Sequence, residues 1–116
     1  MNFPIEPQHL LWWLIVAHCI ADWACQGDLI IQKKGKYAVV MLVHCIAWAG
    51  VVSIPLALAG MMAPWKVPFL VFGHFVMDQW KCYKWAKWKG TEEQFMKYVY
   101  IDQVWHLIQL LIVSVI

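Results

Sequence analysis

Four long apolar segments make up most of this 116-residue chain, and they restrict its fold more than any other feature. They run over residues 10–29, 37–58, 67–83 and 98–116. A helix needs about 17–25 mostly apolar residues to cross a lipid bilayer, and each segment reaches that length. Strands are disfavoured, because an open sheet cannot satisfy its edges in lipid. The sequence therefore predicts an all-α integral membrane four-helix bundle that forms a single transmembrane domain.

Composition supports a membrane location and excludes several other classes of protein. Hydrophobic residues are 63% of the chain and charged residues only 14%, whereas soluble domains carry about 25% charged residues. These values exclude a soluble globular enzyme, and they exclude a disordered chain, which needs low hydrophobicity. The formal net charge of +2 is too small to indicate nucleic acid as a partner. The expected partner is the lipid bilayer.

The segment WKCYKWAKWKG at 80–90 interleaves lysine with aromatic residues. Such a pattern can stack nucleic-acid bases. A membrane interface explains it better, because Trp and Tyr favour the headgroup region and lysine extends its ammonium to water. We therefore interpret this segment as part of an aromatic belt and expect no nucleic-acid binding.

The placement of the lysines predicts how the bundle is oriented. The connections after the first and third apolar segments contain Lys33, Lys34, Lys36, Lys84, Lys87, Lys89 and Lys97. The connection after the second segment has only Lys66. Lysine is enriched in cytoplasmic connections, so the first and third connections are expected inside and both termini outside. This predicts a multi-pass protein of the bacterial inner (cytoplasmic) membrane.

Histidine and aspartate recur inside the apolar segments at a regular spacing. Three pairs are separated by four residues, and a fourth histidine stands alone: His18 and Asp22, His74 and Asp78, Asp102 and His106, and His44. A spacing of four places both side chains on one face of a helix. Measured from the lysine-rich ends at about 1.5 Å per residue, all seven lie at a similar depth in the cytoplasmic leaflet. Inserting one Asp at the centre of a membrane helix costs about 2.5–3.5 kcal/mol of free energy. The grouping of these seven residues at one depth therefore indicates a shared site.

A divalent metal would explain this group. Imidazole and carboxylate are ligands of zinc, manganese and iron, and helix bundles build metal sites from inward-facing side chains. The predicted ligands are His18, Asp22, His44, His74, Asp78, Asp102 and His106. Seven candidate ligands exceed the four that one structural zinc binds, so one or two ions are expected. Zinc is the preferred metal, and manganese and iron are the alternatives. The competing interpretation is hydrogen bonding between helices, which contributes about 0.6 kcal/mol per bond.

The pattern also has an internal symmetry. A hairpin with H-x-x-x-D on its first helix and a histidine on its second occurs twice. Two parallel helical-hairpin repeats would bring the imidazoles and carboxylates together in the bundle core.

The surrounding residues indicate which chemistry such a metal would serve. An Asp not fully committed to metal would act as general base, with Asp22, Asp78 and Asp102 as candidates. Gln26, Lys81 and Gln103 lie near the predicted ligands and suit an anionic substrate such as a phosphate ester or an anionic lipid. Neither Ser53 nor Ser114 is near enough to serve as a nucleophile.

The ordered motifs resemble those of a known family. They are H-x-x-x-D-W-x-x-Q (18–26), a lone histidine at 44, H-x-x-x-D-x-x-K (74–81) and D-Q-x-x-H (102–106). This set resembles small bacterial and phage membrane proteins grouped as a domain of unknown function, over nearly the whole chain. The resemblance implies a four-helix membrane protein but no activity. The H-x-x-x-D pattern alone is loosely similar to membrane-bound metal-dependent hydrolases.

Two functional hypotheses follow. The first is a membrane-embedded, metal-dependent hydrolase that acts on a phosphate or other ester at the cytoplasmic leaflet. The second is a non-catalytic membrane protein, either an ion or proton conduit or a phage-encoded modulator of a host membrane complex. The outer half of each segment is almost wholly apolar, which argues against a continuous conduit. A homodimer is an alternative to a bundle that closes within one chain.

Overall fold

The computed structural model describes residues 3–24, 36–86 and 92–116, and these residues form helices without any strand. A short 3-10 turn, η1 (Pro7–His9), leads into α1 (Leu10–Cys19), which continues as the π-helical segment η2 (Ile20–Ala24). The other long helices are α3 (Ala38–Leu58), α4 (Lys66–Ala86) and α5 (Glu92–Val115). The predicted all-α class is confirmed over the described residues.

The helix boundaries follow the apolar segments to within three residues, with two larger differences. The helix α5 starts six residues before the expected 98, and its first turns include Glu93, whose carboxylate suits the positive end of a helix dipole. The predicted first helix, 10–29, is α-helical only to Cys19 and then widens into the π-turns of η2. Its last residues lie outside the described part of the chain.

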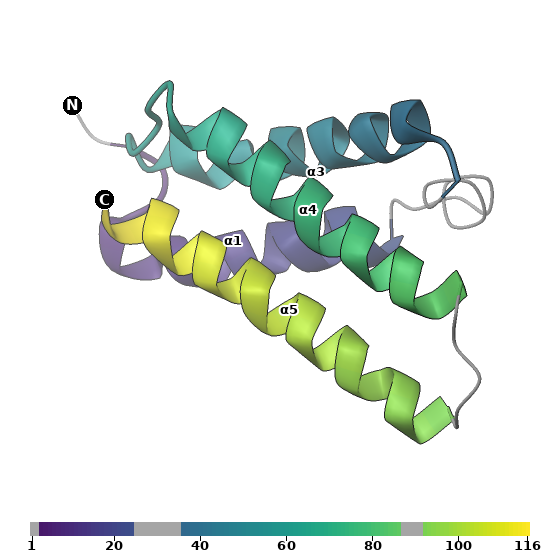
Figure 1. Ribbon diagram of the computed structural model, residues 1–116. Helices are drawn as coiled ribbons and strands as arrows, with labels where there is room; N and C mark the ends of the chain where they lie inside the picture. Colours follow the sequence, from purple (N-terminus) through teal and green to yellow (C-terminus); the bar gives the residue numbers. More distant parts are fainter. Residues whose placement is uncertain (1–2, 25–35, 87–91) are drawn as a thin grey trace.

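The four long helices run alternately up and down, so that both chain termini lie at the same end of the bundle (Figure 1). The connection between α3 and α4 shares this end. The amide of Ile5 donates to the carbonyl of Leu58 at 3.2 Å, and the Lys66 ammonium donates to the carbonyl of Val113 at 2.9 Å. The lysine therefore fixes the start of α4 to the last turn of α5, where a cation also suits the negative end of the helix dipole.

The apolar core occupies this same end. Its largest members are fully buried: Leu10, Leu14, Trp48, Leu56, Leu70 and Leu110. Polar side chains form the next part of the interior, and the outside is apolar. Val39 is 73% exposed, Phe72 is 70% exposed and Tyr100 is 64% exposed. Among the described residues, α3 and the stretch Met96–Val115 of α5 are long and apolar enough to cross a membrane.

Candidate metal centre

Six of the seven predicted ligands converge in two groups that share one carboxylate. The first group is Asp22, His44, His74 and Asp78, and the second is Asp22, Asp102 and His106. Within each group the ligand atoms all lie within 4.8 Å of one another. All six side chains are buried. Residues from η2, α3, α4 and α5 therefore meet at one place inside the bundle.

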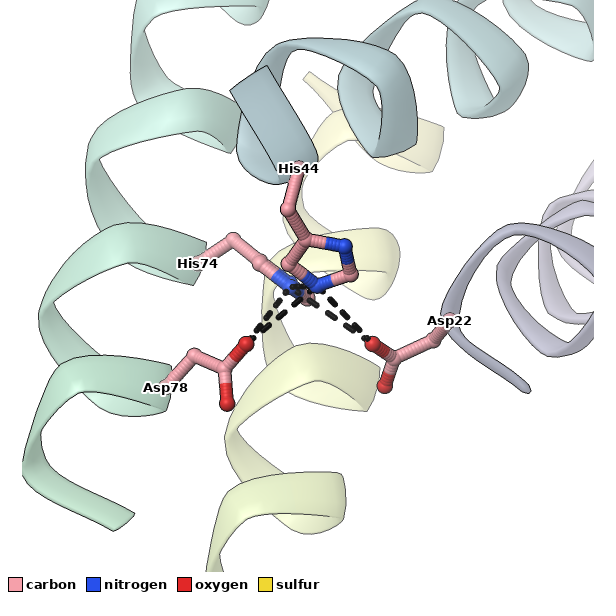
Figure 2. A group of neighbouring side chains, drawn as sticks. All are labelled: Asp22, His44, His74 and Asp78. Carbon is pink, nitrogen blue, oxygen red and sulfur yellow. Dashed lines mark hydrogen bonds and ion pairs between the residues drawn. The ribbon is translucent and has the colours of Figure 1, made fainter. Parts of the chain in front are cut away.

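The first group has the more compact geometry (Figure 2). His44 Nε2 and His74 Nε2 are 3.0 Å apart. His44 Nε2 lies 3.5 Å from Asp22 Oδ1 and 3.2 Å from Asp78 Oδ2. His74 Nε2 lies 3.6 Å from each of the same two oxygens. Two imidazole nitrogens and two carboxylate oxygens thus point at a common centre.

Two of the three residues of the second group, Asp102 and His106, lie on α5. Asp102 and His106 are four residues apart, so their side chains lie one turn apart on the same face. His106 Nε2 is 3.0 Å from Asp102 Oδ1. The His106 ring stacks on the ring of His74, with centroids 4.2 Å apart and planes at 22°. The two groups are therefore in direct contact.

Local structure explains how Asp22 reaches both groups. It lies in η2, where the π-turns point side chains in directions that a regular α-helix would not give. Such π-segments occur frequently at functional sites. In contrast, His74 and Asp78 lie on the regular helix α4, and their spacing of four places both on the face that meets α3.

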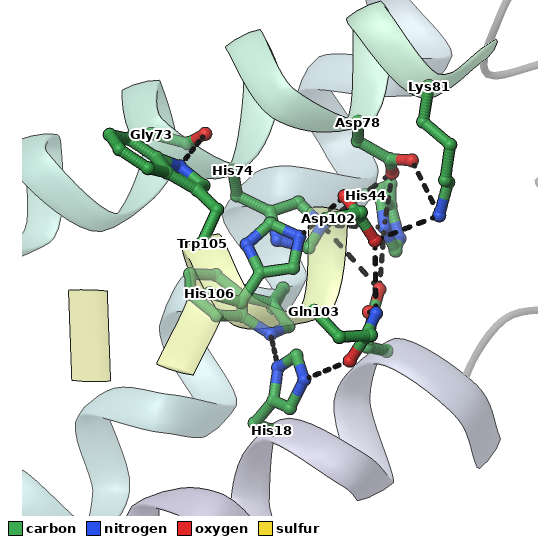
Figure 3. A network of polar contacts seen from close by, with 12 residues as sticks. His18, His44, Gly73, His74, Asp78, Lys81, Asp102, Gln103, Trp105 and His106 are labelled. Carbon is green, nitrogen blue, oxygen red and sulfur yellow. Dashed lines mark hydrogen bonds and ion pairs between the residues drawn. The ribbon is translucent and has the colours of Figure 1, made fainter. Parts of the chain in front are cut away.

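His18 lies outside both groups, although its spacing from Asp22 predicted it as a ligand. Its Nε2 is 2.8 Å from Gln103 Oε1 (Figure 3). The indole nitrogen of Trp48 donates to its Nδ1 at 3.0 Å. Both ring nitrogens are thus occupied by protein partners.

Gln103, which was predicted to bind substrate, contacts His18 and two carboxylates of the centre. Its amide nitrogen donates to Asp22 Oδ2 at 3.2 Å and to Asp102 Oδ2 at 3.0 Å, while its oxygen faces His18. Every polar atom of the side chain therefore contacts the protein. Gln103 joins two carboxylates of the centre and holds them in place.

Lys81, which was predicted to bind substrate, contacts both groups and retains access to solvent. Its ammonium is 3.3 Å from Asp78 Oδ1 and 3.1 Å from Asp102 Oδ2, and its side chain is 16% exposed. It therefore touches one carboxylate of each group. Gln26, the third predicted substrate-binding residue, lies outside the described part of the chain.

Trp48 is a site residue that the sequence interpretation missed, because it was placed in the apolar outer half of its segment. It is fully buried, donates to His18 and stacks on His74 with centroids 4.4 Å apart. Its position four residues after His44 was the available signal, since that spacing places both on one helix face.

These helices and the buried His/Asp groups define a small all-α protein with a candidate metal centre. The chain belongs to the family described as protein of unknown function (DUF3307), whose model matches residues 10–116. No curated protein and no solved structure matches the chain.

Proposed function

We propose that this protein is a membrane-embedded, metal-dependent hydrolase that acts on a phosphate or other ester at the cytoplasmic leaflet. The observation that supports it best is the spacing of the first group. In tetrahedral zinc sites the bonds to nitrogen and oxygen are about 2.0–2.2 Å, which places neighbouring ligand atoms about 3.3 Å apart. The distance between the Nε2 atoms of His44 and His74, and the four distances from these atoms to the two Asp oxygens, are between 3.0 and 3.6 Å.

Charge supports a cation in the same place. Asp22, Asp78 and Asp102 are all buried, and Lys81 is the ammonium that contacts two of them. With neutral imidazoles, three carboxylates and one ammonium leave a net charge of −2. Isolated buried charge is costly, and one divalent ion would neutralise this excess.

Water would have to be the nucleophile of such an enzyme. The hydroxyls of Ser53 and Ser114 both donate to backbone carbonyls of their own helices. A divalent ion lowers the pKa of bound water to about 7 and polarises an ester oxygen, which is the chemistry that hydrolysis requires. Asp22, Asp78 and Asp102 are the candidates for the general base, which would be an Asp that is not fully committed to metal. Lys81 would pair with an anionic phosphate group.

A membrane location supports the choice of substrate. Large apolar side chains cover much of the outside of the bundle, and the His and Asp side chains of the candidate centre are buried in its interior. Exposed apolar surface of this extent is rare on soluble monomers. Zinc, manganese or iron would serve the centre, and an anionic lipid or a soluble phosphate ester could reach it from the lysine-rich side.

Metal content and hydrolysis, measured on the same samples, test the proposal. The full chain, purified in detergent, is assayed for bound metal by mass spectrometry and for hydrolysis of p-nitrophenyl phosphate and of phosphatidic acid in vesicles. The variant is His44→Ala, and the matched control is His9→Ala, whose exposed imidazole lies by Glu6. We expect metal and hydrolysis in the wild type and in the control, and neither in His44→Ala. Less than about half a metal per chain would reject a metalloenzyme, because such sites bind tightly at neutral pH.

A non-catalytic metal protein is the second candidate, and one observation favours it. Four protein ligands, as in the first group, are typical of closed structural zinc sites, whereas catalytic sites keep a position open. Two observations together would support this candidate instead: the purified protein contains metal but does not hydrolyse the substrates, and removal of the metal unfolds it.

A further inference from the structure

The orientation of one glutamine determines where His106 has its proton. Gln109 is buried, and its amide nitrogen donates to the carbonyl of Phe69 at 3.1 Å. A backbone carbonyl only accepts, so the amide oxygen must be the atom that faces His106. His106 Nδ1 lies 3.3 Å from this oxygen and is therefore the donor. In a neutral imidazole the other nitrogen, Nε2, then has a lone pair and no hydrogen.

That lone pair faces a second acceptor. His106 Nε2 and Asp102 Oδ1 are 3.0 Å apart, and both side chains are 0% exposed. Neither atom has a hydrogen-bond partner among the described residues. Two buried acceptors at this distance repel each other unless a positive charge lies between them. The pair therefore requires a cation.

A carboxylate of the first group completes the arrangement. The ligand atom that Asp22 offers lies within 4.8 Å of those of Asp102 and His106. The second group thus has three ligands of the types that divalent metals prefer. It lies beside the first group and shares Asp22 with it, as in two-metal sites, whose ions are about 3.5–4 Å apart.

We propose that Asp22, Asp102 and His106 form a second divalent-cation position with coordination places left open for the phosphate of a substrate. This extends the proposed function and rests on it through the shared Asp22. Three protein ligands and an open place are typical of catalytic zinc, whereas four are typical of structural zinc. The Lys81 ammonium, 3.1 Å from Asp102 Oδ2, stands beside the open position and would contact the bound anion.

Titration of the metal-free full chain in detergent with Co²⁺ tests the second position. Tetrahedral Co²⁺ absorbs visible light strongly and Co²⁺ with more ligands absorbs weakly, so the two positions are distinguished by their spectra. We expect two equivalents in the wild type, the first with strong bands and the second with weak ones. Asp102→Asn, which keeps the shape of the side chain, and His106→Ala should each lose the second equivalent and retain the first. His9→Ala should bind both.

The other outcomes separate the two proposals. A wild type that binds one equivalent, lost in His44→Ala and retained in His106→Ala, would overturn the second position and leave the first. A wild type that binds none would overturn both. The ¹⁵N NMR signals of His106 in the Zn²⁺-loaded chain provide a separate readout. A ring with its hydrogen on Nδ1 and with Nε2 bound to the metal is expected, and an imidazolium in the loaded chain would overturn the proposal, because a proton and not the metal would then lie between the two acceptors.

Discussion

The indole nitrogen of Trp48 donates to Nδ1 of His18 at 3.0 Å, and this contact sets the direction of a chain of hydrogen bonds that ends at two carboxylates. Indole only donates, so Nδ1 must accept and Nε2 must hold the hydrogen. That hydrogen is donated to the oxygen of Gln103, whose amide nitrogen then faces Asp22 and Asp102. Partners of this kind orient the ligands of a metal without binding it.

Replacing His18 should weaken metal binding without removing a metal position. In His18→Ala the oxygen of Gln103 loses its donor, and the side chain is free to turn away from the carboxylates. We expect metal affinity to fall about 10–100-fold, which is typical for loss of such a supporting residue. Affinity is measured by competition with a chelating dye, with His44→Ala as the comparison that loses the metal. Loss of an entire equivalent in His18→Ala would show that the imidazole is itself a ligand.

Removing the amide of Gln103 should destabilise the metal-free protein. Gln103→Leu leaves Asp22 Oδ2 and Asp102 Oδ2 without this donor. Buried acceptors without donors cost about 1–3 kcal/mol, and the free energy of unfolding should fall by that amount. Denaturant titration in detergent measures it. Gln8→Leu is the control, because its side chain contacts Glu6 on the surface and the change should stay within about 0.5 kcal/mol. Equal effects of the two substitutions would contradict the role of Gln103.

Two glycines on neighbouring helices should respond oppositely to the same substitution. A Cβ at Gly73 would overlap Gln109 Nε2, so Gly73→Ala must displace the buried amide and its bond to Phe69. Overpacking of this kind costs about 1–3 kcal/mol. A Cβ at Gly50 meets nothing within 4 Å, and Gly50→Ala should gain about 0.5–1 kcal/mol. Thermal unfolding of both variants in detergent measures the difference, and a stable Gly73→Ala would contradict the packing.

Metal should stabilise the fold, and its removal should reverse the effect. A ligand that binds only the folded state at about 100 times its dissociation constant adds about 2.7 kcal/mol to the free energy of unfolding. We expect Zn²⁺ to raise the melting temperature of the wild type and EDTA to lower it again. His44→Ala should melt at the same temperature with or without Zn²⁺. A rise in that variant would mean that the ion acts elsewhere.

The predicted orientation can be tested with reporter fusions. Alkaline phosphatase is active only outside the cytoplasm, whereas green fluorescent protein exported in an unfolded form stays dark. With both termini outside, a C-terminal alkaline phosphatase fusion should be active and a fluorescent fusion dark. Fusions after Lys89, in the third connection, should give the opposite result. An active phosphatase at Lys89 would reverse the topology.

Local sequence determined where the helices are. Hydropathy is a property of consecutive residues, so the apolar run 37–58 predicted α3 (Ala38–Leu58) to within one residue at its start. The early start of α5 was missed because its first turns, from Glu92 to Lys97, are polar and belong to no apolar run. The spacing of His74 and Asp78 likewise predicted a shared face on α4, since both lie on one regular helix.

Only the tertiary structure decided what each polar side chain does. The segments His18-Cys-Ile-Ala-Asp22 and His74-Phe-Val-Met-Asp78 have the same spacing and predicted the same role for both histidines. In the folded chain the nitrogens of His18 are taken by Trp48 and Gln103, whereas Nε2 of His74 faces two carboxylates. The sequence by itself predicted which polar residues lie in the interior of the bundle. Their partners come from other helices and from the π-turns of η2, and no spacing along one helix contains that information.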